Sequence, residues 1–330
     1  MAVATLVVSV GPGCRPPPSS EPVSTSPVTS DDAPFGRSAE APRAVAVSER
    51  REATIHFEQR DGKPFPYPLV HARVRGVETR LILDTGASHT VLDVWLLEQL
   101  GVELVPSGQP GEGHAGEAVT TSRARAPHLT IAGWGEVPGD ALAVRLPSLF
   151  RALGLGGVVS PQSLATDDTA VILDLPESSL RRVPRDEARR DPAVSLGSAD
   201  LCHVGDESDG VVYVVDAVVE GLPARLVVDS GAARTDVLAE SVAGQRLRAR
   251  ASRGDPSYTV SGRVHGQRVD DVTLTVGQVV TTLDLGLMSG RPSGACPRDG
   301  HLGLDVLMGC ALVLTPDDFG ARCGGTARRQ

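Results

Sequence analysis

A short motif that occurs twice constrains this chain more than any other feature of its sequence. One apolar run ends at Asp84-Thr85-Gly86, and a second ends at Asp229-Ser230-Gly231. The two aspartates lie 145 positions apart (229 − 84). The same offset relates the flanking residues Val74, Gly76, Arg80 and Leu129–Ile131 to Val219, Gly221, Arg225 and Leu274–Val276. This internal duplication predicts two similar halves, each of which supplies one aspartate to a shared centre.

The composition favours a β-rich fold. The chain has 330 residues, enough for about two domains, and it contains 36 glycines and 25 prolines. Residues of these two types favour many tight turns between short strands over long helices. The net charge of −9 argues against a nucleic-acid-binding protein, because phosphate contacts need a basic surface.

The first 50 residues differ in character from the rest. Residues 1–14 contain a short apolar run, which predicts an export signal. Two interpretations stay open: Cys14 is the acylated cysteine of a lipoprotein-type signal and tethers the protein to a membrane, or the N-terminus carries no lipid. Residues 15–50 are rich in Pro and Ser and predict a disordered tether. We therefore expect an exported periplasmic or cell-envelope protein, lipid-anchored if Cys14 is modified.

The remainder divides into two predicted lobes. Residues 51–180 form the N-terminal lobe, and residues 198–325 repeat its pattern as the C-terminal lobe. Residues 181–197 are rich in charge and predict a linker. Because one chain holds both copies of the motif, we expect a monomer.

Two carboxylates at one centre favour hydrolysis of a peptide bond without a covalent intermediate. Close carboxylates cannot both ionise cheaply, so Asp84 and Asp229 would share one proton and titrate as a unit. The ionised aspartate would take a proton from a water between them. The protonated one would hydrogen-bond the scissile carbonyl and help to protonate the leaving nitrogen. A turn with no catalytic role is the simpler explanation of one copy, but not of two matched copies.

The neighbours of the aspartates suit this arrangement. Gly86 and Gly231 allow the two backbones to approach closely. We expect the Thr85 and Ser230 hydroxyls to hydrogen-bond across to the other half and fix the pair.

These motifs resemble the aspartic proteases of the retropepsin and pepsin clan, in a two-lobed single-chain form. A second signature of the clan, an apolar stretch with glycine before a short helix, is similar to Gly300–Leu307 and, with Ser160 at the place of Gly303, to Gly156–Leu164. The resemblance implies a mostly β protein with two duplicated retropepsin-like β-barrel lobes and an active cleft between them. It also implies an aspartic endopeptidase that acts on peptide or protein substrates.

The resemblance further implies a flap, a hairpin that closes over the substrate. By position the flap is Gly111–Val119, with Gly113, His114 and Gly116, or else the second-lobe segment Pro256–Gly262, with Tyr258. His114 would either touch substrate or be a solvated loop histidine, and its glycine-rich surroundings favour the solvated loop. The first candidate has no Tyr or Trp to cover the cleft. In addition, Ala233 stands where the first copy has Ser88.

These departures motivate a second hypothesis, a catalytically weak or inactive peptide-binding protein on the same fold. A glycosidase pair is a third, but those carboxylates sit on unlike elements and farther apart. No Cys-x-x-Cys or His-Glu-x-x-His motif is present, so we expect no metal. Gly154–Gly157 lacks the spacing of a dinucleotide motif, so we expect no cofactor.

The cysteines beyond Cys14 all fall in the second lobe. Four residues, Cys202, Cys296, Cys310 and Cys323, allow two disulfides in three pairings. Cys310 lies in an apolar run and is alternatively a buried thiol.

Overall fold

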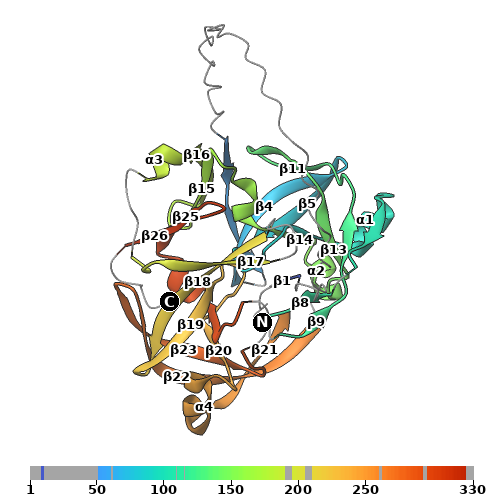
Figure 1. Cartoon of the computed structure of the whole chain (residues 1–330). Helices are drawn as coiled ribbons and strands as arrows, with labels where there is room; N and C mark the ends of the chain where they lie inside the picture. Colours follow the sequence, from blue (N-terminus) through green and yellow to red (C-terminus); the bar gives the residue numbers. More distant parts are fainter. Residues whose placement is uncertain are drawn as a thin grey trace, which may run out of the picture.

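The computed structural model describes residues 9–10, 51–60, 62–108, 110–114, 116–189, 195–204, 210–259, 262–292 and 296–324. Cys14, the predicted tether and most of the predicted export signal lie outside these residues. The fold is mostly β and duplicated, as the sequence predicts. Figure 1 shows the blue and green strands of the first lobe beside the yellow to red strands of the second.

The first lobe is built on one large sheet. Its strands are β3 (His56–Arg60), β4 (Lys63–Val74), β5 (Val77–Leu83), β6 (Val91–Asp93), β7 (Leu104–Pro106), β10 (Ser122–Ala124), β11 (Leu129–Ile131), β12 (Gly135–Val137), β13 (Ala141–Val144) and β14 (Leu155–Val159). Three short helices accompany it: α1 (Val94–Gln99), α2 (Ser148–Ala152) and η1 (Pro161–Leu164). Asp93 caps α1, because its side chain accepts a hydrogen bond from the Trp95 amide.

The second lobe is built on a matching sheet. Its strands are β17 (Ala199–Val204), β18 (Gly210–Val219), β19 (Leu222–Val228), β20 (Asp236–Leu238), β21 (Ser252–Thr259), β22 (Gly262–Val276), β23 (Val279–Met288) and β24 (Gly300–Leu302). Its helices are α4 (Val242–Leu247), η2 (Arg248–Arg250) and α5 (Leu304–Leu307).

The two sheets share one topology around their centres. In the first, the order is β5-β14-β6-β13, with parallel, antiparallel and parallel pairings. In the second, β19-β24-β20-β23 has the same sequence of pairings. The hairpins that lead into β5 and β19 also match. Arg75-Gly76 and Glu220-Gly221 all have positive φ, the conformation of a tight hairpin turn.

A third sheet joins the lobes and contains strands from both halves of the chain (Figure 1). Its order is β2 (Arg51–Thr54), β16 (Ser179–Pro184), β15 (Thr169–Asp174), β25 (Cys310–Leu314) and β26 (Phe319–Cys323). The predicted linker therefore begins inside a strand: residues 181–184 belong to β16, and α3 (Arg185–Arg189) follows. The apolar residues Leu180 and Val183, both buried, explain why this charged segment pairs as a strand.

Among the described residues, a small sheet has no strand pairing with the large ones. It consists of β1 (Ser9–Val10), β8 (Gly111–Glu112) and β9 (Ala118–Val119). Strands β8 and β9 pair antiparallel, with Gly111 opposite Val119, so the first flap candidate is a hairpin. We call β8, β9 and the described residues between them the first-lobe hairpin.

One hydrophobic core extends through both lobes and consists mainly of Val, Leu, Ile and Ala, as the scarcity of aromatic residues requires. Two disulfides, Cys202–Cys296 and Cys310–Cys323, join the four cysteines. Cys310 is therefore not a free thiol. Among the residues that the structure describes, no helix combines the length and apolar character that crossing a membrane requires.

Candidate active site

The two motif aspartates occupy equivalent places, each at the end of a central strand. Asp84 follows β5, and its amide donates to the Val159 carbonyl at 2.9 Å. Asp229 follows β19, and its amide donates to the Leu302 carbonyl at 3.0 Å. In both lobes the acceptor lies in the neighbouring parallel strand or at its end, so the duplicated topology sets the position of each aspartate. Both side chains are buried.

Backbone amides of the tight turn hold the first carboxyl. Asp84 Oδ1 accepts hydrogen bonds from the amides of Gly86 (2.9 Å) and Ala87 (3.1 Å). Such a turn, closed by an aspartate side chain, is a stable local structure of short polar residues. Both bonds go to Oδ1, so the turn fixes the orientation of the carboxyl group.

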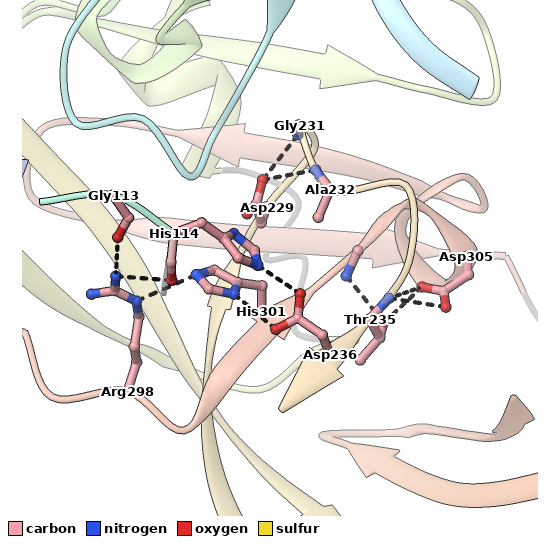
Figure 2. Close-up of polar contacts among 11 residues, drawn as sticks. Gly113, His114, Asp229, Gly231, Ala232, Thr235, Asp236, Arg298, His301 and Asp305 are labelled. Carbon is pink, nitrogen blue, oxygen red and sulfur yellow. Dashed lines mark hydrogen bonds and ion pairs between the residues drawn. The ribbon is translucent and has the colours of Figure 1, made fainter. Parts of the chain in front are cut away.

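The second carboxyl is held in the same way. Asp229 Oδ1 accepts from the amides of Gly231 (2.9 Å) and Ala232 (3.0 Å). Figure 2 shows these two contacts above the polar cluster described below.

The two glycines are required by close packing between the lobes. A Cβ atom at Gly86 would lie 2.7 Å from Cγ of Asp229, and one at Gly231 would lie 2.5 Å from Cγ of Asp84. Each carboxyl therefore lies against the motif backbone of the opposite lobe. Any side chain at either glycine would push the two aspartates apart.

Hydroxyl groups link the motifs across the lobe boundary. The Thr85 hydroxyl donates to the Val228 carbonyl (2.7 Å) and accepts from the Ser230 amide (2.9 Å). The Ser230 hydroxyl donates to the Leu83 carbonyl (2.8 Å) and accepts from the Thr85 amide (3.0 Å). These four buried bonds form the cross-lobe contacts expected from the sequence.

The environment favours one shared proton. Burial raises the pKa of Asp84 well above its ordinary value, and the nearby charge of Asp229 raises it further. The Gly86 and Ala87 amides oppose this shift, but only in part. The two carboxyls therefore titrate as a coupled pair in which the pKa of Asp84 is raised.

Two polar side chains that sequence reasoning missed support the motif loops. The Gln162 side-chain amide donates to the carbonyls of Thr85 (3.0 Å), Ala87 (2.9 Å) and Val211 (2.9 Å). In the second lobe, Asp305 accepts from the Thr235 amide and hydroxyl. Asp305 comes two residues after Gly303, and Gln162 comes two residues after the equivalent Ser160; that shared spacing was the available signal.

The first-lobe hairpin reaches the second lobe through His114. This residue was expected to be a solvated loop histidine, but it is fully buried. Its Nε2 lies 2.8 Å from Oδ2 of Asp236, and its ring stacks on that of His301 with centroids 3.6 Å apart. The expectation failed because the hairpin carries His114 onto β20 and β24 of the other lobe (Figure 2).

Arg298 binds the same hairpin from the second lobe. Its guanidinium donates to the carbonyls of Gly113 (3.1 Å) and His114 (3.4 Å). It also forms an ion pair with Glu112 at 3.2 Å, and it is almost fully buried. The turn closes locally with the Gly116 amide donating to the Gly113 carbonyl.

The second flap candidate is also a hairpin, formed by β21 and β22. Tyr258 lies in β21 opposite Arg263 of β22. The described residues place only the first-lobe hairpin against the polar cluster beside Asp229.

Comparison with known families agrees with this geometry. The sequence profile described as "Aspartyl protease" matches residues 70–157 and again residues 215–306, one match for each lobe. A search of curated proteins found no match.

Proposed function

Since the chain belongs to the aspartyl protease family, we propose that it is an aspartic endopeptidase that hydrolyses peptide bonds with a water held between Asp84 and Asp229. The observation that carries this proposal is the buried pair of carboxyls, each fixed through Oδ1 and packed against the glycine of the other lobe.

The proton positions assign a role to each residue. Ionised Asp229 takes a proton from the water while the water oxygen attacks the scissile carbonyl carbon. At the same time Asp84 gives its proton to the carbonyl oxygen. The resulting tetrahedral diol collapses. The C–N bond breaks as Asp229 returns its proton to the leaving nitrogen, and a diol hydroxyl returns one to Asp84. The dyad thereby recovers its single shared proton.

Cleavage of a mixed peptide library from acid to neutral pH tests this mechanism. Asp84→Asn and Asp229→Asn should each abolish turnover, whereas Asp216→Asn, at an exposed carboxyl of β18, should cleave like the wild type. Circular dichroism would show that the variants fold. Turnover in both dyad variants would exclude the mechanism.

A peptide-binding protein without turnover is the second candidate. The first flap candidate has no Tyr or Trp, and Ala233 stands where the first copy has Ser88; these departures favour it. Peptide binding by the wild type with no product at any pH would support this candidate over the protease.

We infer further that the protein is exported and acts as a monomer. Two disulfides suit an oxidising compartment, and a single chain supplies both aspartates. Cell fractionation and the solution mass of the active species would test the two inferences separately.

A further inference from the structure

We propose that His114, Asp236, His301 and Arg298 form an interlobe latch that holds the first-lobe hairpin closed over the aspartate pair, and that loss of a proton from His114 releases it. The effect on cleavage rests on the proposed function. The latch itself can be measured without cleavage.

The hairpin is bound by contacts that cross from one lobe to the other. His114 bonds Asp236 and stacks on His301, while Arg298 holds the backbone carbonyls on the same turn. Figure 2 shows His114 between Asp229 on one side and Asp236 with His301 on the other. The hairpin therefore lies beside the proposed catalytic centre, not in solvent.

The two carboxyls beside the closed hairpin are inaccessible. Asp84 is 1% exposed and Asp229 is 0% exposed. A peptide must come within hydrogen-bonding distance of these carboxyls, so the covering segment must first move away. The first-lobe hairpin is the covering element that the other lobe binds by side-chain contacts.

The hydrogen bonds define the protonation of the histidines. The Arg298 guanidinium can only donate, so His301 Nε2, 3.3 Å from its Nε, is an acceptor. His301 Nδ1 then carries the proton and donates to Asp236 Oδ1 at 3.0 Å. His114 Nε2 donates to the other oxygen, Oδ2. Both oxygens of Asp236 are thus satisfied by histidine donors.

Among the described residues, the charged groups that act on His114 come from elements packed against it. Asp236 of β20 and Asp229 after β19 favour its protonated form, whereas Arg298, just before β24, opposes it. His301 of β24 faces the His114 ring, and Glu112, on the hairpin itself, is paired with Arg298. The net environment is that of a cation held by a carboxylate.

The shifts agree with this charge pattern. Burial would lower the pKa of His114, but ionised Asp236 raises it above the ordinary value of 6.5. Burial, followed by the charge of His114, lowers the pKa of His301 to about 3. The pKa of Asp236 is lowered, because the two histidines outweigh its burial.

The sign of the pH dependence follows. Because latching raises the pKa of His114, protonation stabilises the closed state. That contribution is complete below about 6.5 and is lost as the pH rises through the raised value. Below about 3, a proton on His301 would add a cation beside His114 and Arg298 and weaken the latch. The hairpin is therefore held most firmly between these limits and opens toward higher pH.

A metal site is the rival explanation of the same side chains. His114, Asp236 and His301 each offer a ligand atom, and these atoms lie within 4.8 Å of one another. A metal at His301 Nδ1 would place the ring proton on Nε2, where it would face the N–H of Arg298. The donor from Arg298 therefore favours a hydrogen-bonded cluster over a metal centre.

Hydrogen exchange of the hairpin amides in the full chain tests the proposal. After correction for the intrinsic rates, exchange should be slow at pH 5.5 and about tenfold or more faster at pH 8. Asp236→Asn and His114→Gln should exchange rapidly at both pH values. His203→Gln, at an exposed histidine of β17, should behave like the wild type. If Asp236→Asn fails to fold, His114→Gln on the hairpin gives the same readout.

The outcomes separate the latch from the proposed function. Exchange that is equal at both pH values and unchanged in His114→Gln would overturn the latch, even if cleavage needs Asp84. Fast hydrogen exchange in His114→Gln, with no cleavage by the protein at any pH, would support the latch and contradict the proposed protease function. Protection of the hairpin that appears only on adding Zn²⁺ would assign the cluster to a metal and overturn the latch.

Discussion

The two lobes differ most at a pair of positions that their topology makes equivalent. Where β14 pairs with β6 in the first lobe, Val158 lies opposite Val91. Where β24 pairs with β20 in the second, His301 lies opposite Asp236. All four side chains are buried beside a motif loop. One lobe thus has an apolar pair where the other has a polar pair that binds the hairpin of its neighbour.

This difference separates two uses of the duplication. The aspartates, glycines and hydroxyls match in both lobes, because a shared centre needs the same geometry from each side. The latch needs only one hairpin and one receptor, so a single lobe carries the buried polar pair. In the first lobe, the place that corresponds to Asp236 and His301 is occupied by Val91 and Val158. These apolar side chains offer no polar partner to the second-lobe hairpin, β21–β22.

Substitutions at the two motif glycines, which are equivalent in the two lobes, should have the largest effect on cleavage. Gly86→Ala and Gly231→Ala each place a Cβ within 2.7 Å of the opposite carboxyl, and overpacking of this kind costs about 1–3 kcal/mol. The carboxyls must separate, so cleavage should fall below detection in both variants. Gly309→Ala, whose nearest neighbour would be 4.0 Å away, is the control for an added methyl group. Activity in either motif variant would contradict the close packing of the centre.

Making the second lobe like the first should have the next largest effect. Asp236→Val alone leaves His114 and His301 without their carboxylate and should cost about 3–5 kcal/mol of unfolding free energy. Asp236→Val with His301→Val copies the first-lobe pair and should recover part of that loss, because His301 no longer lacks a partner while His114 still does. Urea unfolding at pH 6 measures both. A double variant no more stable than the single one would show that the positions are not interchangeable.

The two cross-lobe hydroxyls, of Thr85 and Ser230, should contribute equally to the free energy of unfolding. Thr85→Val and Ser230→Ala each remove two buried hydrogen bonds and leave their partners unsatisfied, which costs about 2–3 kcal/mol. The double variant should cost less than the sum, because each hydroxyl bonds the backbone amide of the other residue. A large difference between the single variants in urea unfolding would refute the equivalence of the two sides.

Replacing Asp305, which supports the second motif loop, should have the smallest effect on the free energy of unfolding. This effect should depend on pH. Burial raises the pKa of Asp305 to about 6, so the folded state holds its proton more tightly than the unfolded state. Stability from this group is complete below 3.8 and is lost as the pH rises through 6, with about 2 kcal/mol of the loss between pH 4.5 and pH 7. Asp305→Asn, which resembles the neutral Gln162 of the first lobe, should lack this decline. Urea unfolding at pH 4.5 and pH 7 would reveal it, and an unchanged slope would contradict the assignment.

The sequence predicted the parts of the site that depend on short-range pattern. Asp84, Asp229, their glycines and their hydroxyls recur in two matched copies, and each copy carries its own local turn. The parts that depend on contacts between distant segments were not predictable in the same way. Nothing in the glycine-rich stretch around His114 indicates which surface the hairpin packs against.

A closer comparison of the copies would have given a partial signal for the receptor. Asp236 and His301 interrupt apolar strands at positions where the first copy has Val91 and Val158. The cysteine pairing was open for a different reason, since four cysteines allow three connectivities and only the fold selects one.

The sheet that joins the lobes has a consequence for the biosynthesis of the protein. Its strand β2 begins at residue 51, and its last strand, β26, ends at residue 323. A nascent chain cannot complete this sheet until β26 has left the ribosome, and pairings so distant in sequence form slowly. The sheet that ties the lobes together is therefore assembled only after both motif aspartates, at 84 and 229, have long been made. The order of synthesis thus delays the joining of the two lobes, and with it the proposed shared centre, until residue 323 is available.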